Sequence, residues 1–405
     1  MSDMKILVAN IGSTSFKFCL FSMPEERILA KGGMERIGSS EAPFQFQAEN
    51  QPLRKSVQPV ADYAAALRLA FEALTGEGGV LPSVGELSAI GFKPIIAKGY
   101  SGTQELTEKV LAAMESFQTL APAHNPPYIQ AVRLIRGEFP DIPLIGTFET
   151  AFYDALPESA CVFAVPQEWR RRFGIRRYGY HGASHRYVAE RAAVLLKNPA
   201  ARLISCHLGG SSSMAAVRAG VAVESSWAMT PQSGLPHNNR VGEFDAFALL
   251  YLMKDCGLGL AEVERTLMKE SGLKGIAGTP SGDLRDILAA VDRGSAEAGL
   301  ALEYLVKSIR KYIGQFLVEL NGADGIIFTG GIGENSPLVR RLVCADLDQL
   351  GILLDPTANE AAIRREAEIS AAASRVHLLT IPTSEETVIA REACLYLQNE
   401  KERNN

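Results

Sequence analysis

The chain has 405 residues, of which 47% are hydrophobic and 21% are charged, a balance typical of globular proteins and far from that of disordered chains. Because one domain usually has about 100–200 residues, the length predicts two domains. The formal net charge of -5 argues against a general nucleic-acid or anionic-membrane binder, because such proteins carry a basic surplus.

The sequence carries no signal for a membrane or for export. No apolar run approaches the roughly 20 residues that span a bilayer, and the first residues lack a signal-peptide pattern. The six cysteines are widely spread and form no CxxC motif, which predicts reduced and mostly buried thiols. We therefore expect a cytoplasmic protein with no membrane and no nucleic-acid partner.

The first predicted elements are the strands of a meander. Lys5–Ala9 leads through a Gly-Ser turn into Phe16–Phe21, and Arg27–Ala30 follows after a proline break. The same order returns about 200 residues later, where Arg202–Leu208 leads through a second Gly-Ser turn into Met214–Arg218 and a further strand. Chance can produce two such short units. Because the spacing is half the chain, we interpret them instead as the openings of a duplicated domain.

Strands and helices alternate in the rest of each half. Ala89–Phe92 and Leu144–Thr147 are predicted buried strands of the first half, and Ile326–Thr329 is one of the second. The strongest helical pattern covers Ala296–Leu320, with Ser295 as its N-cap. This alternation predicts an α/β fold with mixed sheets. The segments predicted to be loose are Glu41–Pro59 and the polar tail Glu400–Asn405.

Three Gly-rich turns follow predicted strands and are candidate phosphate cradles, because a glycine turn lets backbone N–H groups approach an anion. Each turn alone is more often an ordinary hairpin or helix start, and none matches the P-loop or GxGxxG pattern. The candidate phosphate-binding residues are Asn10, Ser13, Ser15 and Lys17 in the first turn, His207, Gly209, Gly210 and Ser211 in the second, and Gly330, Gly331, Gly333 and Asn335 in the third.

A series of motifs, spread over nearly the whole chain, resembles one family in order and spacing. The motifs are Asn10–Lys17, Ala121–Pro126, Thr147–Phe152, Arg177–Tyr187, Thr230–Arg240, Ser281–Asp286, Phe328–Ser336 and Ile381–Glu386. Together they resemble the acetate kinase family, within the superfamily of actin, sugar kinases and heat-shock chaperones. The motifs are highly specific for the family and much less specific for the substrate.

The resemblance implies an architecture and an activity. It implies an actin-like ATPase fold, in which two domains share a duplicated βββαβαβα core of the ribonuclease-H type. By analogy, residues 1–149 plus 386–405 would form the N-terminal domain, and residues 150–385 the nucleotide-binding domain. It also implies a homodimer that uses ATP and Mg²⁺ to phosphorylate a short carboxylate to an acyl phosphate, releasing ADP.

The implied reaction needs cations more than proton transfer. A carboxylate is already ionised at pH 7, so the obstacle is to bring one anion to an anionic γ-phosphoryl group. The resemblance assigns catalytic roles to Arg240, His181, Lys93 and Glu149, Mg²⁺ binding to Asn10 and Glu385 with help from Glu149, and the adenosine pocket to Asp283 and Arg285.

Plainer interpretations of several residues stay open. His181 and His185 are four residues apart and could be a metal pair, although the sequence offers no third ligand of the HExxH kind. Glu385 lies inside a capping box formed by Thr383 and Glu386, so it could serve only the helix dipole. Asp283 could be a first-turn helix acid, and Arg240 a surface arginine.

The chain departs from the family pattern near the substrate. Lys93 replaces an arginine and loses its bidentate fork, Glu149 replaces an aspartate, and Gly210 replaces an asparagine. The residues expected to line the pocket for the acid are Ile95, Ala123, Tyr180 and Pro231. Because Ala123 stands for a leucine and Tyr180 for a phenylalanine, we expect a roomier and more polar pocket, suited to a propionate-sized or hydroxylated acid.

Three functions compete on the sequence alone. The first is a carboxylate kinase with acetate as the default acceptor. The second is a kinase of the same superfamily for a hydroxyl acceptor, with Glu149 as the base. The third is a nucleotide-binding protein with little turnover, an alternative that the changes at Lys93, Glu149 and Gly210 motivate.

Overall fold

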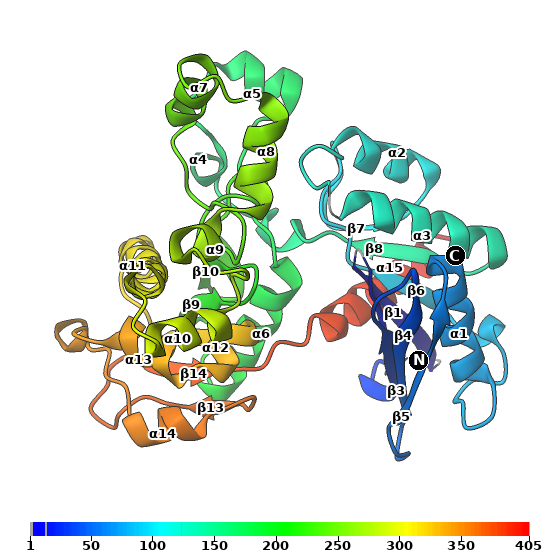
Figure 1. The fold of residues 1–405 in the computed structure, drawn as a ribbon. Coiled ribbons are helices and arrows are strands. Elements are labelled where there is room, and N and C mark those ends of the chain that lie inside the picture. Colours follow the sequence, from blue (N-terminus) through cyan, green and yellow to red (C-terminus); the bar gives the residue numbers. More distant parts are fainter. Residues whose placement is uncertain (1–2, 13, 123, 405) are drawn as a thin grey trace. The chain divides into compact units, whose positions relative to one another are not determined.

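The computed structural model describes residues 3–12, 14–122 and 124–404 of the chain. The chain divides into two compact units, Met1–Asp154 with Ser384–Asn405, and Ala155–Thr383. Each unit is built on a sheet with helices packed against it (Figure 1). The first unit therefore takes its last helix from the far end of the chain.

The sheet of the first unit joins an antiparallel meander to parallel strands. Its described strands lie in the order β5-β4-β3-β2-β1-β6-β8-β7, and β1, β6 and β8 run parallel. The bounds are β1 Met4–Ile11, β2 Phe16–Met23, β3 Arg27–Met34, β4 Ser39–Ala48, β5 Arg54–Val60, β6 Ala89–Phe92, β7 Thr103–Glu105 and β8 Leu144–Thr147.

Both faces of this sheet are covered, and the residues of β1 show why. Successive strand residues point to opposite faces. Ile6 and Val8 pack with Ile389 of the last helix, α15, on one face, whereas Leu7 and Ala9 pack into the core beneath α1, α2 and α3 on the other. The helices are α1 Tyr63–Thr75, α2 Glu108–Ser116, α3 Asn125–Glu138 and α15 Glu385–Asn404, with short 3₁₀ turns at Val84–Glu86 and Ala151–Tyr153.

The sheet of the second unit repeats the topology of the first. Its described strands lie in the order β11-β10-β9-β12-β14-β13, with β9 antiparallel to β10 and parallel to β12. These directions match those of β1, β2 and β6 in the first unit, and β12 is parallel to β14 as β6 is to β8. The predicted duplication is therefore confirmed. The bounds are β9 Arg202–His207, β10 Ser213–Arg218, β11 Val221–Ser225, β12 Gly325–Thr329, β13 Ala367–Glu368 and β14 His377–Thr380.

The helices of the second unit include the long predicted helix, α11, which begins after Ser295. The Ser295 hydroxyl accepts a hydrogen bond from Ala298 N, as an N-cap does. The helices are α4 Glu158–Cys161, α5 Gln167–Phe173, α6 Gly182–Leu195, α7 Ala246–Lys254, α8 Leu260–Lys269, α9 Gly272–Ala277, α10 Leu284–Asp292, α11 Ala296–Glu319, α12 Gly330–Asn335, α13 Pro337–Cys344 and α14 Pro356–Ala361, with a 3₁₀ turn at Asp348–Leu350.

The two segments predicted to be loose are ordered elements, so that prediction was wrong. Glu41–Pro59 lies within the hairpin of β4 and β5, which extends the meander through backbone pairing with β3. Ala42, Phe46 and Ala48 alternate with polar residues along β4 and are buried, a strand signal that the surrounding prolines and glutamines obscured. The described part of the polar tail, residues 400–404, forms the end of α15.

The sequence predicted no membrane-spanning segment and mostly buried, unpaired cysteines, and both predictions can be compared with the structure. Within the described residues, no helix is both long enough and apolar enough to cross a membrane. The cysteines, all of which lie in the described part of the chain, are free thiols, and all except Cys256 are buried. The prediction of reduced, mostly buried cysteines is therefore confirmed.

Candidate active site

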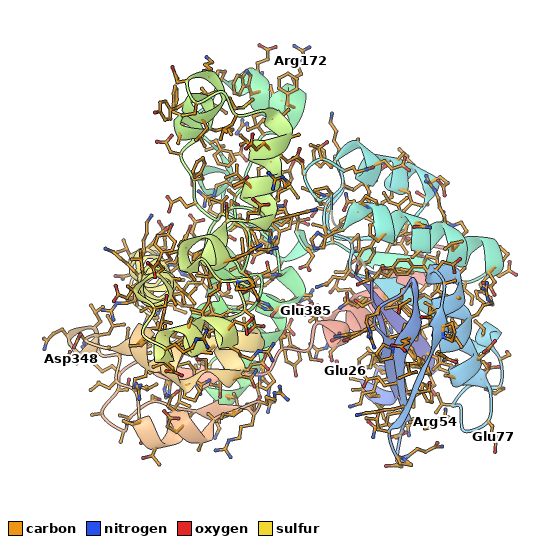
Figure 2. All side chains as sticks on the ribbon, viewed as in Figure 1. Glu26, Arg54, Glu77, Arg172, Asp348 and Glu385 are labelled. Carbon is orange, nitrogen blue, oxygen red and sulfur yellow. The ribbon has the colours of Figure 1, made fainter. Side chains whose placement is uncertain are left out.

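A lysine bridges two glutamates in the first unit. Lys93 follows β6, Glu149 follows β8, and Glu385, which Figure 2 labels, begins α15. The Lys93 Nζ lies 2.6 Å from Glu149 Oε1 and 2.5 Å from Glu385 Oε2. Because β6 and β8 are parallel, their carboxyl ends meet at one edge of the sheet, where open α/β sheets bind their ligands. The structure thus joins three residues that lie far apart in the sequence.

The lysine of this cluster is held in its charged form. The side chains of Lys93, Glu149 and Glu385 are 13%, 3% and 13% exposed. Burial by itself would lower the pKa of Lys93, but the carboxylates of Glu149 and Glu385 outweigh burial and hold that pKa well above its usual 10.5. Lys93 is therefore an ammonium ion at neutral pH.

A buried tyrosine connects the cluster to the first Gly-rich turn. Tyr128 of α3 accepts a hydrogen bond from Ile11 N at 3.4 Å, and its hydroxyl lies 3.5 Å from Asn10 Oδ1. Burial raises the pKa of Tyr128 to about 12, although the nearby Lys93 opposes the shift. Tyr128 is a member of the site that the sequence did not reveal, because no motif marks it.

The oxygen atoms of this cluster are of the kind that Mg²⁺ prefers. Asn10, Glu149 and Glu385 offer amide and carboxylate oxygens, and the two carboxylates already converge on the Lys93 ammonium ion. Within the described residues, no group of three or more His, Cys, Asp or Glu side chains could hold a metal ion. The donor set therefore suits a metal ion that takes its other ligands from phosphate and water. The His181–His185 metal pair, by contrast, finds no third protein ligand there.

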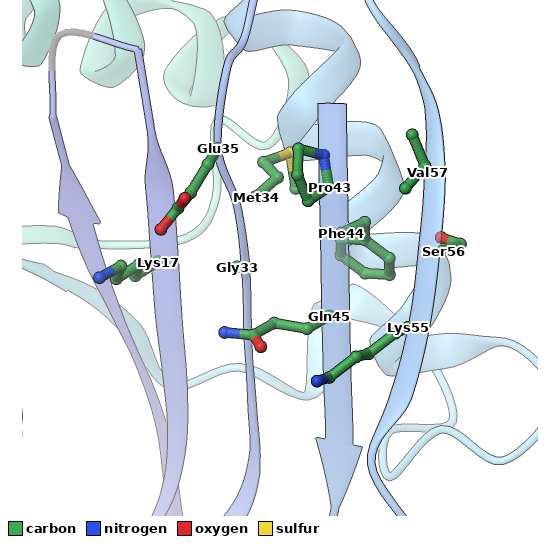
Figure 3. A pocket seen from close by; sticks show the side chains of 10 residues that line it. All are labelled: Lys17, Gly33, Met34, Glu35, Pro43, Phe44, Gln45, Lys55, Ser56 and Val57. Atoms are coloured by element: carbon green, nitrogen blue, oxygen red, sulfur yellow. The ribbon is translucent and has the colours of Figure 1, made fainter. Parts of the chain in front are cut away.

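Lys17, the basic residue predicted for the first turn, lies on the face of the sheet. It is directly opposite Asn10 in the β1–β2 register and opposite Gly33 of β3. The same row continues through Gln45 and Lys55 along a hollow of about 490 Å³ (Figure 3). Ser13 lies outside the described residues. Ser15 closes the turn, because its carbonyl accepts a hydrogen bond from Gly12 N at 2.8 Å.

The second unit gathers histidines and serines where α6 meets β9 and β10. His181 Nδ1 and His185 Nε2 each lie 2.8 Å from the Ser213 Oγ. The ring centroids of His207 and His181 lie 4.2 Å apart. His207 Nδ1 lies 2.7 Å from Ser184 Oγ. Ser184, Ser213 and His185 are fully buried. These contacts join the candidate catalytic His181 to the candidate phosphate residue His207.

The backbone of His181 adopts the left-handed conformation just before α6. Its φ is +56°, which is uncommon for a residue other than glycine. Such a conformation persists only when the surroundings enforce it, and it is frequent at functional sites. Here it directs the chain into α6, which packs against β9, β10 and β12 (Figure 1).

Arg240 is half-buried and is held by a backbone contact. Its guanidinium group donates to the Pro231 carbonyl at 2.5 Å, and burial lowers the pKa of Arg240 to about 10. At neutral pH it remains charged. Behind it His237, which is fully buried, stacks on Trp227 with ring centroids 5.0 Å apart. Burial and the charge of Arg240 lower the pKa of His237 well below 6.5.

The hydroxyl group of Tyr180, which we expected to make the acid pocket more polar, has a backbone partner. Its hydroxyl donates to the Met229 carbonyl at 2.6 Å, and its side chain is 2% exposed. Pro231 is buried in the same unit, whereas Ile95 is buried in the first unit. Ala123, which we expected to enlarge the pocket, lies outside the described residues.

A pocket of about 370 Å³ in the second unit collects six of the fourteen predicted nucleotide residues. Asp283 plays the helical role considered above, because its carboxylate accepts from Arg285 N and caps α10. It also pairs with the Arg285 side chain at 2.8 Å, and these hydrogen bonds lower the pKa of Asp283. The pocket is lined by Gly209, Gly210, Asn238, Asp283, Leu284, Arg285, Leu288, Gly331, Ile332, Asn335, Ser336 and Arg364. Ser211 follows Gly210 in the same turn.

Two charged residues that the sequence did not reveal support the third turn. Glu334 accepts from Gly330 N at 2.9 Å and from Thr383 N at 3.2 Å. Arg340 is fully buried, donates to the Gly333 carbonyl at 2.7 Å, and also binds Asn359. An arginine between the apolar residues of α13 was the available signal for it. The Thr383 hydroxyl donates to Ser184 at 2.9 Å.

Comparison with protein families gives one match over nearly the whole chain. The model of the acetokinase family matches residues 5–391. Among curated proteins, the acetate kinase of Bacillus cytotoxicus is 40% identical over 391 residues, which cover 96% of this chain and 98% of the relative. The acetate kinase of Natranaerobius thermophilus is 40% identical over 395 residues with the same coverage.

Solved structures agree with the sequence matches. The acetate kinase of Porphyromonas gingivalis superposes with a TM-score of 0.86 at 35% identity, over 97% of this chain and all of the other. A propionate kinase from Francisella tularensis superposes with a TM-score of 0.87 at 31% identity, over 96% of this chain and 98% of the other. Both confirm the actin-like ATPase fold.

Proposed function

The chain belongs to the acetokinase family, and from this premise we propose that it transfers the γ-phosphoryl group of ATP to the carboxylate of a short acid. The products are an acyl phosphate and ADP, and acetate is the default acceptor. The observation that carries the proposal is the match to named acetate kinases at 40% identity over 96% of the chain. A phosphotransferase with a carboxyl acceptor follows from that membership.

The chemistry requires the protein to hold two anions together, the carboxylate and the γ-phosphoryl group of ATP. A carboxylate oxygen attacks the γ-phosphorus, and the bond from that phosphorus to the β–γ bridging oxygen breaks, so no base has to remove a proton. Arg240 supplies a planar cation that can bind a carboxylate and a phosphoryl oxygen at once. Its burial strengthens those interactions, because water screens them less.

His181 and Lys93 complete the proposed catalytic set. A ring N–H of His181 donates to an oxygen of the transferring phosphoryl group, where negative charge is spread in the transition state. Lys93 offsets one of the two negative charges of Glu149 and Glu385, and its ammonium group is the cation that this cluster offers to an acid or phosphate. The proposed nucleotide residues are those that line the pocket of the second unit, together with Asn10, Ser13, Ser15, Lys17 and His207.

Mg²⁺ is the proposed metal, with Asn10, Glu149 and Glu385 as the residues that would hold or orient it. When bound, Mg²⁺ neutralises negative charge on the phosphates. The two glutamates supply carboxylates at a sheet edge. Lys93 holds them together, because its Nζ lies 2.6 Å from Glu149 and 2.5 Å from Glu385. Asn10 adds a neutral oxygen, which Tyr128 orients.

The acid itself is open to a direct test. The panel consists of formate, acetate, propionate, butyrate and lactate with ATP and Mg²⁺, and hydroxylamine traps any acyl phosphate as a hydroxamate. We expect acetate and propionate to lead in kcat/KM, because Tyr180 offers its hydroxyl to Met229 and not to the pocket. Release of ADP without any hydroxamate would favour the hydroxyl-acceptor kinase. ATP binding without release of ADP would favour the third function, a nucleotide-binding protein with little turnover.

A homodimer is the proposed assembly, and its support is an apolar surface on the second unit. Phe247 and Tyr251 of α7 are 77% and 59% exposed, and Leu260 of the neighbouring α8 is 66% exposed. Exposed apolar side chains that form a contiguous patch often mark a protein–protein interface. The cytoplasm is the compartment that this proposal assumes, because it supplies ATP and keeps the free thiols reduced.

A further inference from the structure

A chain of side-chain hydrogen bonds ends on the His181 ring, and it starts at a buried serine of β9. Ser205 Oγ lies 2.8 Å from His185 Nδ1, and His185 Nε2 lies 2.8 Å from Ser213 Oγ. Ser213 Oγ in turn lies 2.8 Å from His181 Nδ1. Ser205, His185 and Ser213 are fully buried. We call this chain the Ser205–His185–Ser213 relay.

We propose that the Ser205–His185–Ser213 relay fixes the tautomer of His181, so that its proton resides on Nε2 and can be donated to the phosphoryl group. Ser205, His185 and Ser213 are thus positioning residues for His181. The inference deepens the proposed function, because it explains how a neutral imidazole is made into a reliable donor.

Within the described residues, the buried Ser213 hydroxyl makes hydrogen bonds only to His181 and His185, so its proton is satisfied only when it donates to one of them. With that condition, the protons of the relay can be arranged in two ways. Each hydroxyl carries one proton, and a neutral imidazole carries one proton on one of its nitrogens. In the first arrangement Ser205 donates to His185, His185 donates to Ser213, and Ser213 donates to His181 Nδ1. The proton of His181 is then on Nε2. In the second arrangement every bond is reversed, and the proton of His181 is on Nδ1.

The surroundings of Ser205 decide between the two arrangements. Within the described residues, the Ser205 hydroxyl makes a hydrogen bond only to His185. In the first arrangement it donates there and its proton is satisfied. In the second it accepts there, and its own proton is left buried without an acceptor. That loss favours the first arrangement by a factor of about 5 to 150 in population.

His185 transmits the preference because it stays neutral. Burial, together with the nearby His207, lowers the pKa of His185 well below 6.5. A protonated His185 would donate from both nitrogens and would break the order of the relay. His181 itself is only partly buried, and Nε2 is its ring nitrogen on the side away from the Nδ1–Ser213 contact.

The proton position on His181 can be observed directly in the full-length protein. The chain has six histidines, so the long-range ¹H–¹⁵N spectrum of perdeuterated, ¹⁵N-histidine-labelled protein has few imidazole signals. His181→Asn identifies the signals of residue 181 by their loss. We expect the Nε2–H tautomer in the unmodified protein, and a mixture of tautomers in Ser205→Ala. The Nδ1–H tautomer in the unmodified protein would overturn the proposal.

Kinetics give a second and separate readout. We expect Ser213→Ala to lower kcat about 10- to 100-fold, as loss of one transition-state donor does, while KM for ATP and for the acid changes less than about twofold. Ser213→Thr keeps the hydroxyl and should restore kcat. The matched control is Ser22→Ala, which removes an equally buried hydroxyl from the first unit, where it binds Asp3.

The outcomes separate the relay from the proposed function. If Ser213→Ala changes neither the tautomer of His181 nor kcat, or if Ser22→Ala lowers kcat as much, the relay is contradicted. If the unmodified protein phosphorylates no acid, the proposed function fails, and the tautomer spectrum alone still decides the relay. A circular-dichroism melt of each variant excludes those that do not fold.

Discussion

At the scale of single residues, Lys93 is unusual because one ammonium group pairs with two carboxylates. It is the partner of two buried carboxylates, and removal of one member of a buried ion pair costs far more than the pair contributes on balance. The lysine is therefore a structural requirement of the candidate active site as well as a proposed catalytic group.

We predict that Lys93→Met lowers the free energy of unfolding by about 3–5 kcal/mol at pH 7, because it leaves Glu149 and Glu385 buried without a cation. The folded pKa of Lys93 lies above its unfolded value near 10.5, so its stabilisation is complete below pH 10.5 and is lost as the pH rises through the folded pKa. Urea unfolding should thus show the same deficit at pH 7 and pH 9, and a smaller one in stronger alkali.

A matched control is Lys5→Met, which removes a lysine from a more exposed ion pair. Lys5 Nζ lies 3.3 Å from Glu86, whose side chain is 50% exposed. Such pairs contribute less than about 1 kcal/mol, so the control should be nearly neutral. Equal losses in Lys93→Met and Lys5→Met would contradict the account of the cluster.

The residues of the site that the sequence could not supply share one property. Tyr128, Ser213 and Arg340 are buried polar groups whose importance comes from contacts that only the fold brings together. Motifs reveal Lys93, Glu149 and Glu385 as separate positions, but only the fold shows that they meet. Their catalytic and metal-binding roles remain predictions.

At the scale of elements, the Gly-rich turn that begins α12 needs a backbone conformation that residues other than glycine rarely adopt. Gly330 has a φ of +76°, and a Cβ atom there would lie 2.7 Å from the Leu208 carbonyl oxygen. Glycine is therefore required here for two reasons: the left-handed backbone conformation, and the close approach of the chain just after the neighbouring strand.

We predict that Gly330→Ala lowers the free energy of unfolding by about 2 kcal/mol, because a left-handed alanine is strained and its Cβ displaces the turn. The turn forms a wall of the 370 Å³ pocket, so the KM for ATP should rise as well. The control is Gly299→Ala in α11. An added Cβ atom there would meet no atom within 4 Å outside its own helix turn, so alanine should raise the free energy of unfolding by about 0.5–1 kcal/mol. A Gly330→Ala protein with unchanged stability and KM would contradict this.

Elements with regular periods were predictable, and irregular ones were not. The apolar stripe and the Ser295 cap identified α11, and compact apolar runs identified β6, β8 and β12. The hairpin of β4 and β5 was missed because polar residues and prolines interrupt both strands and obscure Ala42, Phe46 and Ala48, which pack in the core. Strand propensity depends on such context more than helix propensity does.

At the scale of the whole molecule, the duplicated sheet explains why cationic groups occur in both units. The parallel strand ends of the first unit present Lys93, and the second unit holds Arg240 and the histidines. A chain with a net charge of -5 can therefore bind anionic ligands at local sites, because net charge does not describe a single pocket.

The proposed homodimer predicts a specific loss of assembly. Phe247→Asp together with Tyr251→Asp places charges on the exposed face of α7 and should convert the dimer to monomer in multi-angle light scattering. Val194→Asp, at a 63% exposed position of α6, is the control and should leave the mass unchanged. A monomeric unmodified protein, or a double variant that remains dimeric, would contradict this interface.

The central claim is that a carboxylate oxygen becomes bonded to the transferred phosphorus, and an isotope label tests it most directly. Acetate labelled with ¹⁸O in both carboxyl oxygens is incubated with the protein, ATP and Mg²⁺, and hydroxylamine then releases the phosphate. We predict one ¹⁸O atom in the released phosphate, seen as an isotope shift in its ³¹P spectrum. Phosphate that carries no ¹⁸O would show that water or another acceptor had received the phosphoryl group, and would contradict the account.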